Sequence, residues 1–175
     1  TNGVLLPGMA AELKAAGVDR VNISLDTLDP EKYRRITRTG TLEDALAGIR
    51  AAGEAGLTPL KLNCVLIGGF NDDEIPALAA LTAREPVEVR FIELMPIGGA
   101  APFGPEAYLP CEAVLERLPD LEALGETGGV AERFRLPGAA GTVGLIRPLS
   151  GCFCGRCDRI RLTADGKLKP CLHSG

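Results

Sequence analysis

The sequence lacks an excess of positive charge and lacks any long apolar run. Its 19 Lys and Arg are outnumbered by 23 Asp and Glu, which leaves a net charge of −4. Because domains that bind nucleic acid are usually basic, this balance argues against that function class. No segment is apolar enough to span a bilayer, and none has the basic start and apolar middle of a signal peptide. These absences favour a soluble, cytoplasmic protein, and the 46% hydrophobic content is ample for a buried core.

Cysteine is scarce over most of the chain, and its position is therefore informative. Of 6 cysteines, four fall within residues 152–171. Cys154 and Cys157 form a C-x2-C motif, and Cys171 follows after a segment that is expected to return as a hairpin. In a cytoplasmic protein such a cluster indicates a metal or redox site sooner than a disulfide framework.

The spacing predicts a metal but leaves its identity open. Together with His173, the three cysteines would form a tetrahedral zinc site. Without the histidine they would suit a [4Fe-4S] cluster with one iron open to a ligand. The remaining interpretation is that these are free core cysteines.

The other cysteines fit the metal site less well. Cys152 is a spare ligand at most, since its closeness to Cys154 strains a shared geometry. Cys64 and Cys111 are expected to be small core residues.

Cations surround the clustered cysteines. Five of them stand against two acidic residues: Arg156, Arg159, Arg161, Lys167 and Lys169 against Asp158 and Asp165. Arg159 and Arg161 alternate along a predicted strand, so both guanidinium groups reach one face and could hold a phosphate. The alternative is a charged, solvated strand edge.

Hydrophobic periodicity predicts three strand–helix units in the first part of the chain. We expect strands within 19–26, 57–69 and 87–96, and helices at about 7–16, 42–55 and 73–84. Alternation of strands and helices of these lengths predicts an α/β fold with a parallel sheet.

The predicted strands alternate between apolar and polar residues, although the strands of a doubly covered parallel sheet are usually apolar throughout. The polar positions are Asn22, Ser24, Asp26, Lys61 and Asn63. If helices cover the apolar face, these side chains line the opposite one, which in a barrel is a lumen with room for a polar ligand. An edge strand or a solvated antiparallel sheet is the alternative.

The character of the sequence changes after Pro96. A Gly/Pro-rich loop leads to a predicted helix near 110–118 and to strands within 131–136 and 142–149. A hairpin over 159–171 is expected to turn at 164–166, where an Asp-Gly pair favours a tight turn. We expect a small β-rich extension laid against the sheet.

Several motifs now carry a resemblance over essentially the whole chain. "TNG", "NISLD", "KLNCVLIGG", "NDDE", "RFIELMP" and "RIRLTADGKLKPCL" after "CxxC" occur in an order and spacing similar to those of the MoaA family. These are the radical S-adenosylmethionine GTP 3′,8-cyclases of molybdenum cofactor biosynthesis. The resemblance favours iron–sulfur over zinc.

The resemblance implies a fold and a reaction. Residues 1–97 would be the last three βα units of an incomplete (β/α)6 TIM-type barrel, and residues 98–175 an extension with an auxiliary [4Fe-4S] cluster. In the intact enzymes an N-terminal [4Fe-4S] cluster cleaves S-adenosylmethionine, and GTP becomes (8S)-3′,8-cyclo-7,8-dihydroguanosine 5′-triphosphate. The implied partners are GTP, S-adenosylmethionine, a second copy in a homodimer, and the downstream cyclic pyranopterin monophosphate synthase, MoaC.

The resemblance also implies roles for individual residues. The metal ligands are Cys154, Cys157 and Cys171, and His173 becomes a bystander. The GTP contacts are Lys61, Arg159 and Arg161, and the S-adenosylmethionine contacts are Ser24 and Met95.

One family feature is missing. The CxxxCxxC motif of the radical-generating cluster and the Gly-rich loop after it are not in this sequence, which opens at Thr1. We therefore expect a C-terminal fragment that is inactive alone. Another radical S-adenosylmethionine enzyme with an auxiliary cluster, and a non-enzymatic zinc-ribbon module, are the competing hypotheses.

Overall fold

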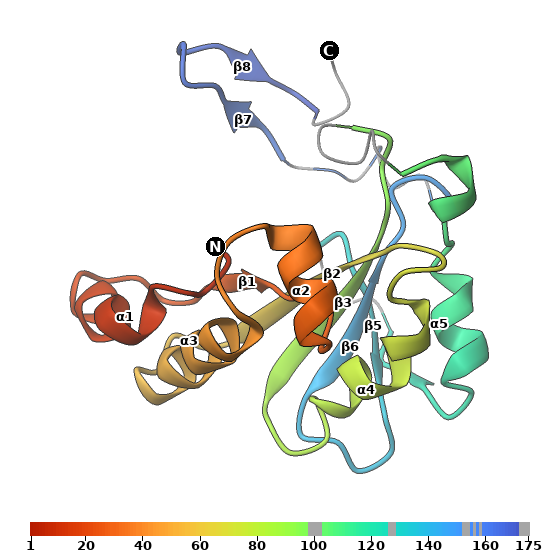
Figure 1. The fold of residues 1–175 in the computed structure, drawn as a ribbon, viewed down its shortest axis with the longest axis horizontal. Coiled ribbons are helices and arrows are strands. Elements are labelled where there is room, and N and C mark those ends of the chain that lie inside the picture. Colours follow the sequence, from red (N-terminus) through yellow and green to blue (C-terminus); the bar gives the residue numbers. More distant parts are fainter. Residues whose placement is uncertain (98–102, 126–128, 152–154, 156, 158, 172–175) are drawn as a thin grey trace.

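The computed structural model describes residues 1–175 except 98–102, 126–128, 152–154, 156, 158 and 172–175. The described residues form a mixed α/β structure around a six-stranded sheet (Figure 1). The strand order is β1-β2-β3-β6-β5-β4. The strands of this sheet are β1 (Asn22–Ser24), β2 (Leu60–Leu66), β3 (Val87–Glu93), β4 (Glu122–Ala123), β5 (Glu132–Arg135) and β6 (Thr142–Ile146).

The sheet is parallel over its first four strands. β1 pairs with β2, β2 with β3 and β3 with β6 in the parallel sense, whereas β5 pairs antiparallel with both β6 and β4. The expected parallel α/β sheet is thus confirmed for the three predicted strands. The strands predicted within 131–136 and 142–149 add to its edge as β5 and β6, so the sheet continues past residue 97.

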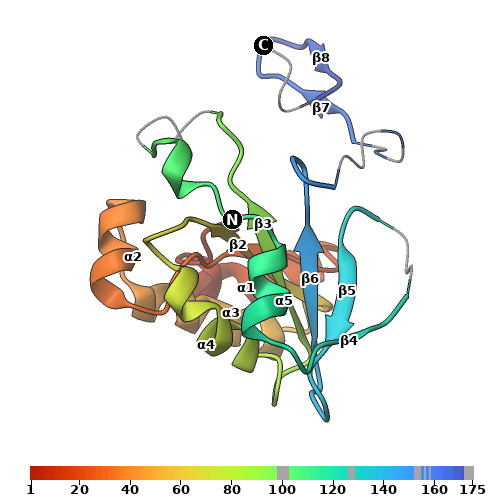
Figure 2. The same ribbon diagram turned by 90° about the vertical axis from the view of Figure 1, so that its right-hand side faces the viewer.

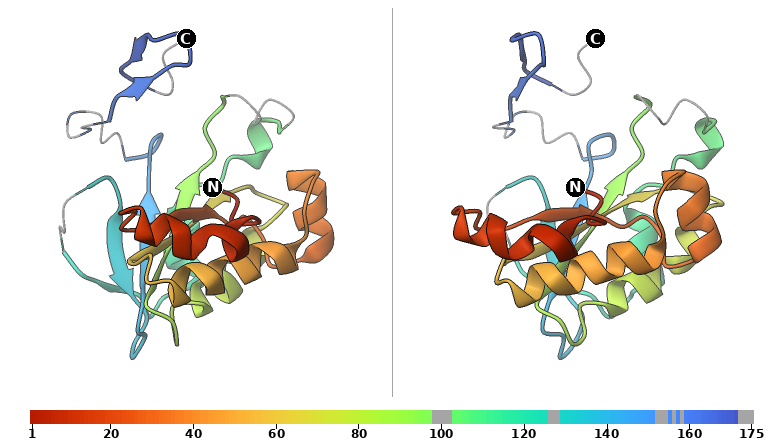
Figure 3. Two further views of the ribbon diagram at one scale, coloured as in Figure 1. Left: turned by 90° about the vertical axis from the view of Figure 1, so that its left-hand side faces the viewer. Right: turned by 60° about the vertical axis from the view of Figure 1, so that its left-hand side comes forward.

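Helices cover one face of this sheet (Figures 2 and 3). They are α1 (Leu6–Ala15), α2 (Pro30–Thr37), α3 (Leu42–Glu54), α4 (Ile75–Ala80) and α5 (Glu112–Arg117), with short 3-10 turns η1 (Asp72–Glu74) and η3 (Pro105–Ala107). Local sequence explains where two of them begin. Asp29 accepts hydrogen bonds from the backbone N–H groups of residues 31 and 32, and Thr41 and Asp44 form a reciprocal capping box.

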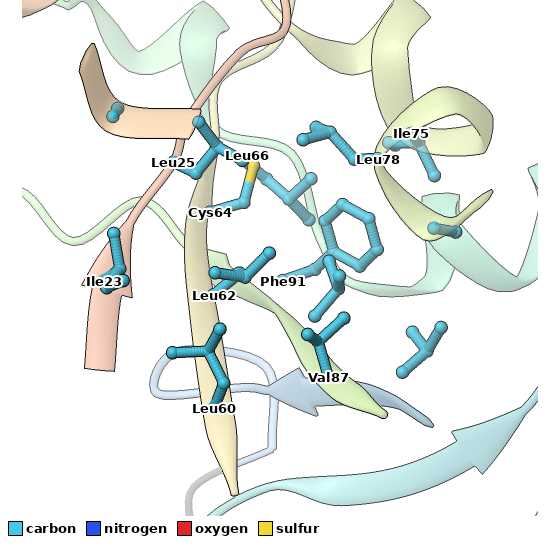
Figure 4. Close-up of a cluster of buried hydrophobic side chains, with 14 of the residues drawn as sticks. Ile23, Leu25, Leu60, Leu62, Cys64, Leu66, Ile75, Leu78, Val87 and Phe91 are labelled. Atoms are coloured by element: carbon cyan, nitrogen blue, oxygen red, sulfur yellow. The ribbon is translucent and has the colours of Figure 1, made fainter. Parts of the chain in front are cut away.

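The hydrophobic core lies between the sheet and the helices (Figure 4). Alternate residues of β2, from Leu60 to Leu66, point into it, and Phe91 of β3 is fully buried. Ile75 and Leu78 of α4 are also buried and belong to the same cluster. The predicted apolar face is therefore the face that the helices cover.

The C-terminal segment forms a hairpin of β7 (Arg161–Leu162) and β8 (Leu168–Lys169). Gly166 has a φ of 82° at its turn, a left-handed conformation that favours glycine. The hairpin and its turn agree with the prediction. Figures 1 and 2 show it standing clear of the six-stranded sheet, so the expectation of an extension laid against the sheet is wrong for this hairpin.

None of the helices in the described ranges is long and apolar enough to cross a membrane.

Candidate functional site

Polar side chains gather on the sheet face opposite the helices, and the strand register places them in two rows. The first row runs Asn22, Lys61, Glu88 and Thr142 across β1, β2, β3 and β6. The second row runs Ser24, Asn63, Arg90, Gly144 and Arg133 across the same strands and β5. These nine residues are called the polar sheet face below. The alternation seen in the sequence therefore predicted the correct sides for Asn22, Ser24, Lys61 and Asn63.

Glu88 is the acidic centre of the polar sheet face, and its side chain is only 8% exposed. Arg90 Nε donates to Glu88 Oε1 over 2.7 Å. Lys61 Nζ and Arg133 Nε lie 3.9 Å and 4.0 Å from Glu88 Oε2. Three cations thus surround one carboxylate in a protein whose total charge is negative. The surplus of positive charge makes this face suited to an anionic ligand.

The surroundings of Lys61 lower the pKa of its ammonium group, so this side chain loses its proton more easily than a free lysine does. Burial lowers the pKa of its ammonium group, and the neighbouring Arg90, Arg20 and Arg133 lower it further, while Glu88 raises it. A bound anion would stabilise the charged form of Lys61 and so offset the effects of burial and of the neighbouring arginines on its pKa.

Two buried polar atoms of this face have no hydrogen-bond partner within the described residues. They are Asn63 Oδ1 and Arg133 Nε. Gly144 allows Arg90 and Glu88 to approach the backbone of β6, since a Cβ there would lie 3.1 Å from Arg90 Cγ and 3.2 Å from Glu88 Oε1. Buried polar atoms normally find partners, so the face has unused capacity for a polar ligand.

The two residues expected to contact S-adenosylmethionine lie at the carboxyl ends of parallel strands. Ser24 is the last residue of β1 and is exposed. Met95 follows β3 by two residues and is half-buried. In parallel α/β sheets this edge is where ligands usually bind. Their contact with a ligand remains a prediction.

The segment from Cys157 to Cys171, called the cysteine–arginine segment below, is described except for residue 158. Cys157 precedes the β7–β8 hairpin and Cys171 follows it, and both are exposed. Arg159, just before β7, and Arg161, in β7, are exposed as well. The antiparallel pairing of Arg161 with Lys169 returns the chain toward its starting point. Cys154, the third expected ligand, lies outside the described residues, as do Cys152 and His173. Within the described residues no three His, Cys, Asp or Glu side chains are gathered as a metal site, and the three-cysteine site remains a prediction.

The remaining two cysteines are core residues, as predicted. Cys64 and Cys111 are buried. Burial raises the pKa of Cys64 well above its usual value, and burial next to Glu93 raises the pKa of Cys111 to about 12. Both groups therefore stay protonated and unreactive at neutral pH.

Three charged residues of the polar sheet face were missed at the sequence level: Glu88, Arg90 and Arg133. A signal existed for the first two, because the alternation used for β2 also places Glu88 and Arg90 on one side of β3. Arg133 gave no such signal, since its place on this face depends on the antiparallel register of β5 with β6.

Two family models match the chain. Residues 87–175 match the model described as Molybdenum Cofactor Synthesis C, and residues 1–82 match that of the Radical SAM superfamily.

Close relatives carry one name. Proteins called GTP 3′,8-cyclase from Alkaliphilus oremlandii and Moorella thermoacetica are each 54% identical to the chain, over 175 and 182 residues. One from Peptoclostridium acidaminophilum is 55% identical over 177 residues. These alignments cover 99% of this chain but only 54–55% of each relative. The chain thus spans about half the length of the curated relatives that it matches.

Proposed function

The chain belongs to the Molybdenum Cofactor Synthesis C family, and we propose that it forms the substrate-holding half of a GTP 3′,8-cyclase. The observation that carries this proposal is the polar sheet face, where Lys61, Arg90 and Arg133 outnumber the single carboxylate of Glu88. A triphosphate supplies the negative charge that this face lacks. The names of the relatives support GTP as the nucleotide.

The proposed architecture is the second half of an incomplete (β/α)6 barrel with an auxiliary-cluster extension. Residues 1–97 supply the barrel units and residues 98–175 the extension. The parallel pairing of β1, β2, β3 and β6 supports a barrel wall, with the helices outside and the polar sheet face toward the lumen.

Each expected residue then has a role. Cys154, Cys157 and Cys171 hold an auxiliary [4Fe-4S] cluster, and two of these residues, Cys157 and Cys171, lie at the surface. Lys61, Arg159 and Arg161 bind GTP. Ser24 and Met95 contact S-adenosylmethionine at the carboxyl edge of the sheet.

The bound clusters and S-adenosylmethionine supply the radical chemistry, and the residues of this chain bind and orient the substrate. Lys61 and the arginines neutralise the triphosphate. The proposed product is (8S)-3′,8-cyclo-7,8-dihydroguanosine 5′-triphosphate, an intermediate of molybdenum cofactor biosynthesis that MoaC would consume. The proposal includes a homodimer.

A binding experiment tests the GTP site directly. After anaerobic reconstitution, the Kd for GTP is measured by calorimetry for the unchanged chain, for Lys61→Met, and for the double variant Arg159→Ala/Arg161→Ala. Each lost charge-assisted contact should weaken binding about tenfold or more. Arg50→Ala removes an exposed arginine of α3, a helix on the other side of the sheet from the polar sheet face, and it should leave the Kd unchanged. Equal affinities for all four proteins would refute the proposal.

Metal analysis separates the cyclase from a zinc-ribbon module. The proposal requires about four irons and four sulfides per reconstituted chain. One equivalent of zinc without sulfide would contradict it.

A further inference from the structure

Glu93, the last residue of β3, is a buried carboxylate that joins three parts of the chain. It is 1% exposed. Its Oε1 atom accepts hydrogen bonds from Cys111 N over 3.3 Å and from Ser150 Oγ. Its Oε2 atom accepts from Leu149 N and Ser150 N, both over 3.0 Å.

The four hydrogen-bond donors around Glu93 favour its ionised form over its protonated form. A buried charge is costly unless donors or counter-charges satisfy it, and hydrogen bonds to an ionised group are stronger than neutral ones. Burial alone acts to raise the pKa of Glu93, but the hydrogen bonds from Ser150, Leu149 and Cys111 outweigh it, and the net pKa is lowered. Glu93 is therefore ionised at neutral pH.

The position of Glu93 connects the two predicted cofactor regions. Met95 lies two residues further along the chain. Leu149 and Ser150 lie between the end of β6 and the segment that carries Cys157 and Arg159. The carboxylate thus joins the exit of β3 to the exit of β6 at the same edge of the sheet.

We propose that Glu93 is a positioning residue that fixes Leu149 and Ser150, the start of the connection from β6 to the cysteine–arginine segment, beside the loop that holds Met95. Arg147, the residue directly after β6, is held by its pairs with Glu112 and Glu132, whereas Glu93 holds the next turn; without Glu93 that turn would loosen, and the cluster and phosphate ligands beyond it would lose their common orientation. The cluster and GTP in this statement rest on the proposed function, whereas the link between the two exits rests on the hydrogen bonds alone.

Glu93→Gln tests this role with little change of volume. The glutamine amide turns one NH2 group toward N–H and O–H donors, so at least one of the four bonds is lost. Hydrogen exchange at the amides of Leu149 and Ser150 should become faster than in the unchanged chain. Loss of the reconstituted cluster to a chelator should become about tenfold faster, as for other residues that orient metal ligands.

Glu74→Gln is the matched control. Glu74 is also a shielded carboxylate, 12% exposed, and it accepts from Thr27 Oγ1 over 2.7 Å and from Leu28 N over 2.6 Å. Its replacement should lower the Tm to a similar extent but leave exchange at Leu149 and Ser150, cluster loss and GTP affinity unchanged.

The outcomes separate the two proposals. If the unchanged chain binds neither cluster nor GTP, the proposed function fails, and hydrogen exchange at residues 149 and 150 alone decides the role of Glu93. Unaltered exchange there in Glu93→Gln would overturn the inference whatever the cluster does. If Glu93→Gln does not fold, Ser150→Ala replaces it. Exchange at the amide of Leu149 should again become faster, and unaltered exchange there would again overturn the inference.

Discussion

Lys61 and Glu88 oppose each other on neighbouring parallel strands, with Lys61 Nζ 3.9 Å from Glu88 Oε2. The same carboxylate accepts a hydrogen bond from Arg90 and approaches Arg133. Because these groups are shielded from water, their charges influence one another strongly. The polar sheet face therefore behaves as one coupled electrostatic unit.

Replacing Glu88 by Gln should lower the pKa of Lys61 further. Burial already lowers this pKa, and Glu88 acts against that effect by favouring the charged ammonium. An NMR titration of the Lys61 side chain measures the change. Glu132→Gln removes a carboxylate that pairs with Arg147 over 3.4 Å and should leave the pKa of Lys61 where it is. An unchanged Lys61 titration in Glu88→Gln would show that the coupling is absent.

Asp26→Asn should stabilise the protein at neutral pH. Burial raises the pKa of Asp26 above 3.8 and outweighs the opposing hydrogen bond from Val65 N, which measures 2.8 Å. The folded state therefore binds the proton more tightly than the unfolded state. The free energy of unfolding falls as pH rises from about 3.8 through the raised pKa. Asn keeps the acceptor for Val65 and removes the charge.

Urea unfolding at about pH 3.5 and at about pH 7 tests this predicted fall in the free energy of unfolding. The variant should match the unchanged protein in acid and exceed it at neutral pH. Asp73→Asn supplies the opposite case, because the hydrogen bond from Lys32 lowers the pKa of Asp73. That exposed pair should contribute only weakly, and only above the unfolded pKa. Equal pH dependence of Asp26→Asn and the unchanged protein would contradict the prediction.

Two glycines of α3 should respond in opposite ways to replacement by Ala. A Cβ at Gly48 would lie 2.0 Å from the carbonyl oxygen of Gly3, so the helix must move away from the N-terminal turn. At Gly53 a Cβ would meet nothing within 4 Å. We expect Gly48→Ala to cost about 1–3 kcal/mol and Gly53→Ala to gain about 0.5–1 kcal/mol. Thermal or urea unfolding measures both, and a stabilised Gly48→Ala would disprove the tight contact.

The sequence predicted those parts of the fold that follow from periodicity. The three parallel strands, α1, α3 and the β7–β8 hairpin lie where alternation or helical spacing placed them. α2 was missed although its signals were present: Asp29 caps it, Pro30 begins it, and Arg34 and Arg35 lie in its last turn. Its eight residues are too few to display a clear apolar stripe.

Contacts between residues far apart in the sequence could not be predicted from periodicity or from helix-capping signals. The positions of Lys61 and Asn63 on one face followed from alternation, but the charge around Glu88 depends on which strands are neighbours. The role of Glu93 depends on donors 56 and 57 residues away in sequence. Nothing local to "RFIELMP" shows that its glutamate is buried and bound by the exit of β6.

The strand order also has a consequence for synthesis of the protein. β6 inserts between β3 and β5, so an interior strand of the sheet is the last of the six to leave the ribosome. Until Ile146 has emerged, β3 has one unsatisfied backbone edge, and β5 can pair only with β4. An emerging chain therefore carries an open edge within its hydrophobic sheet, the kind of surface on which nascent proteins aggregate or recruit chaperones.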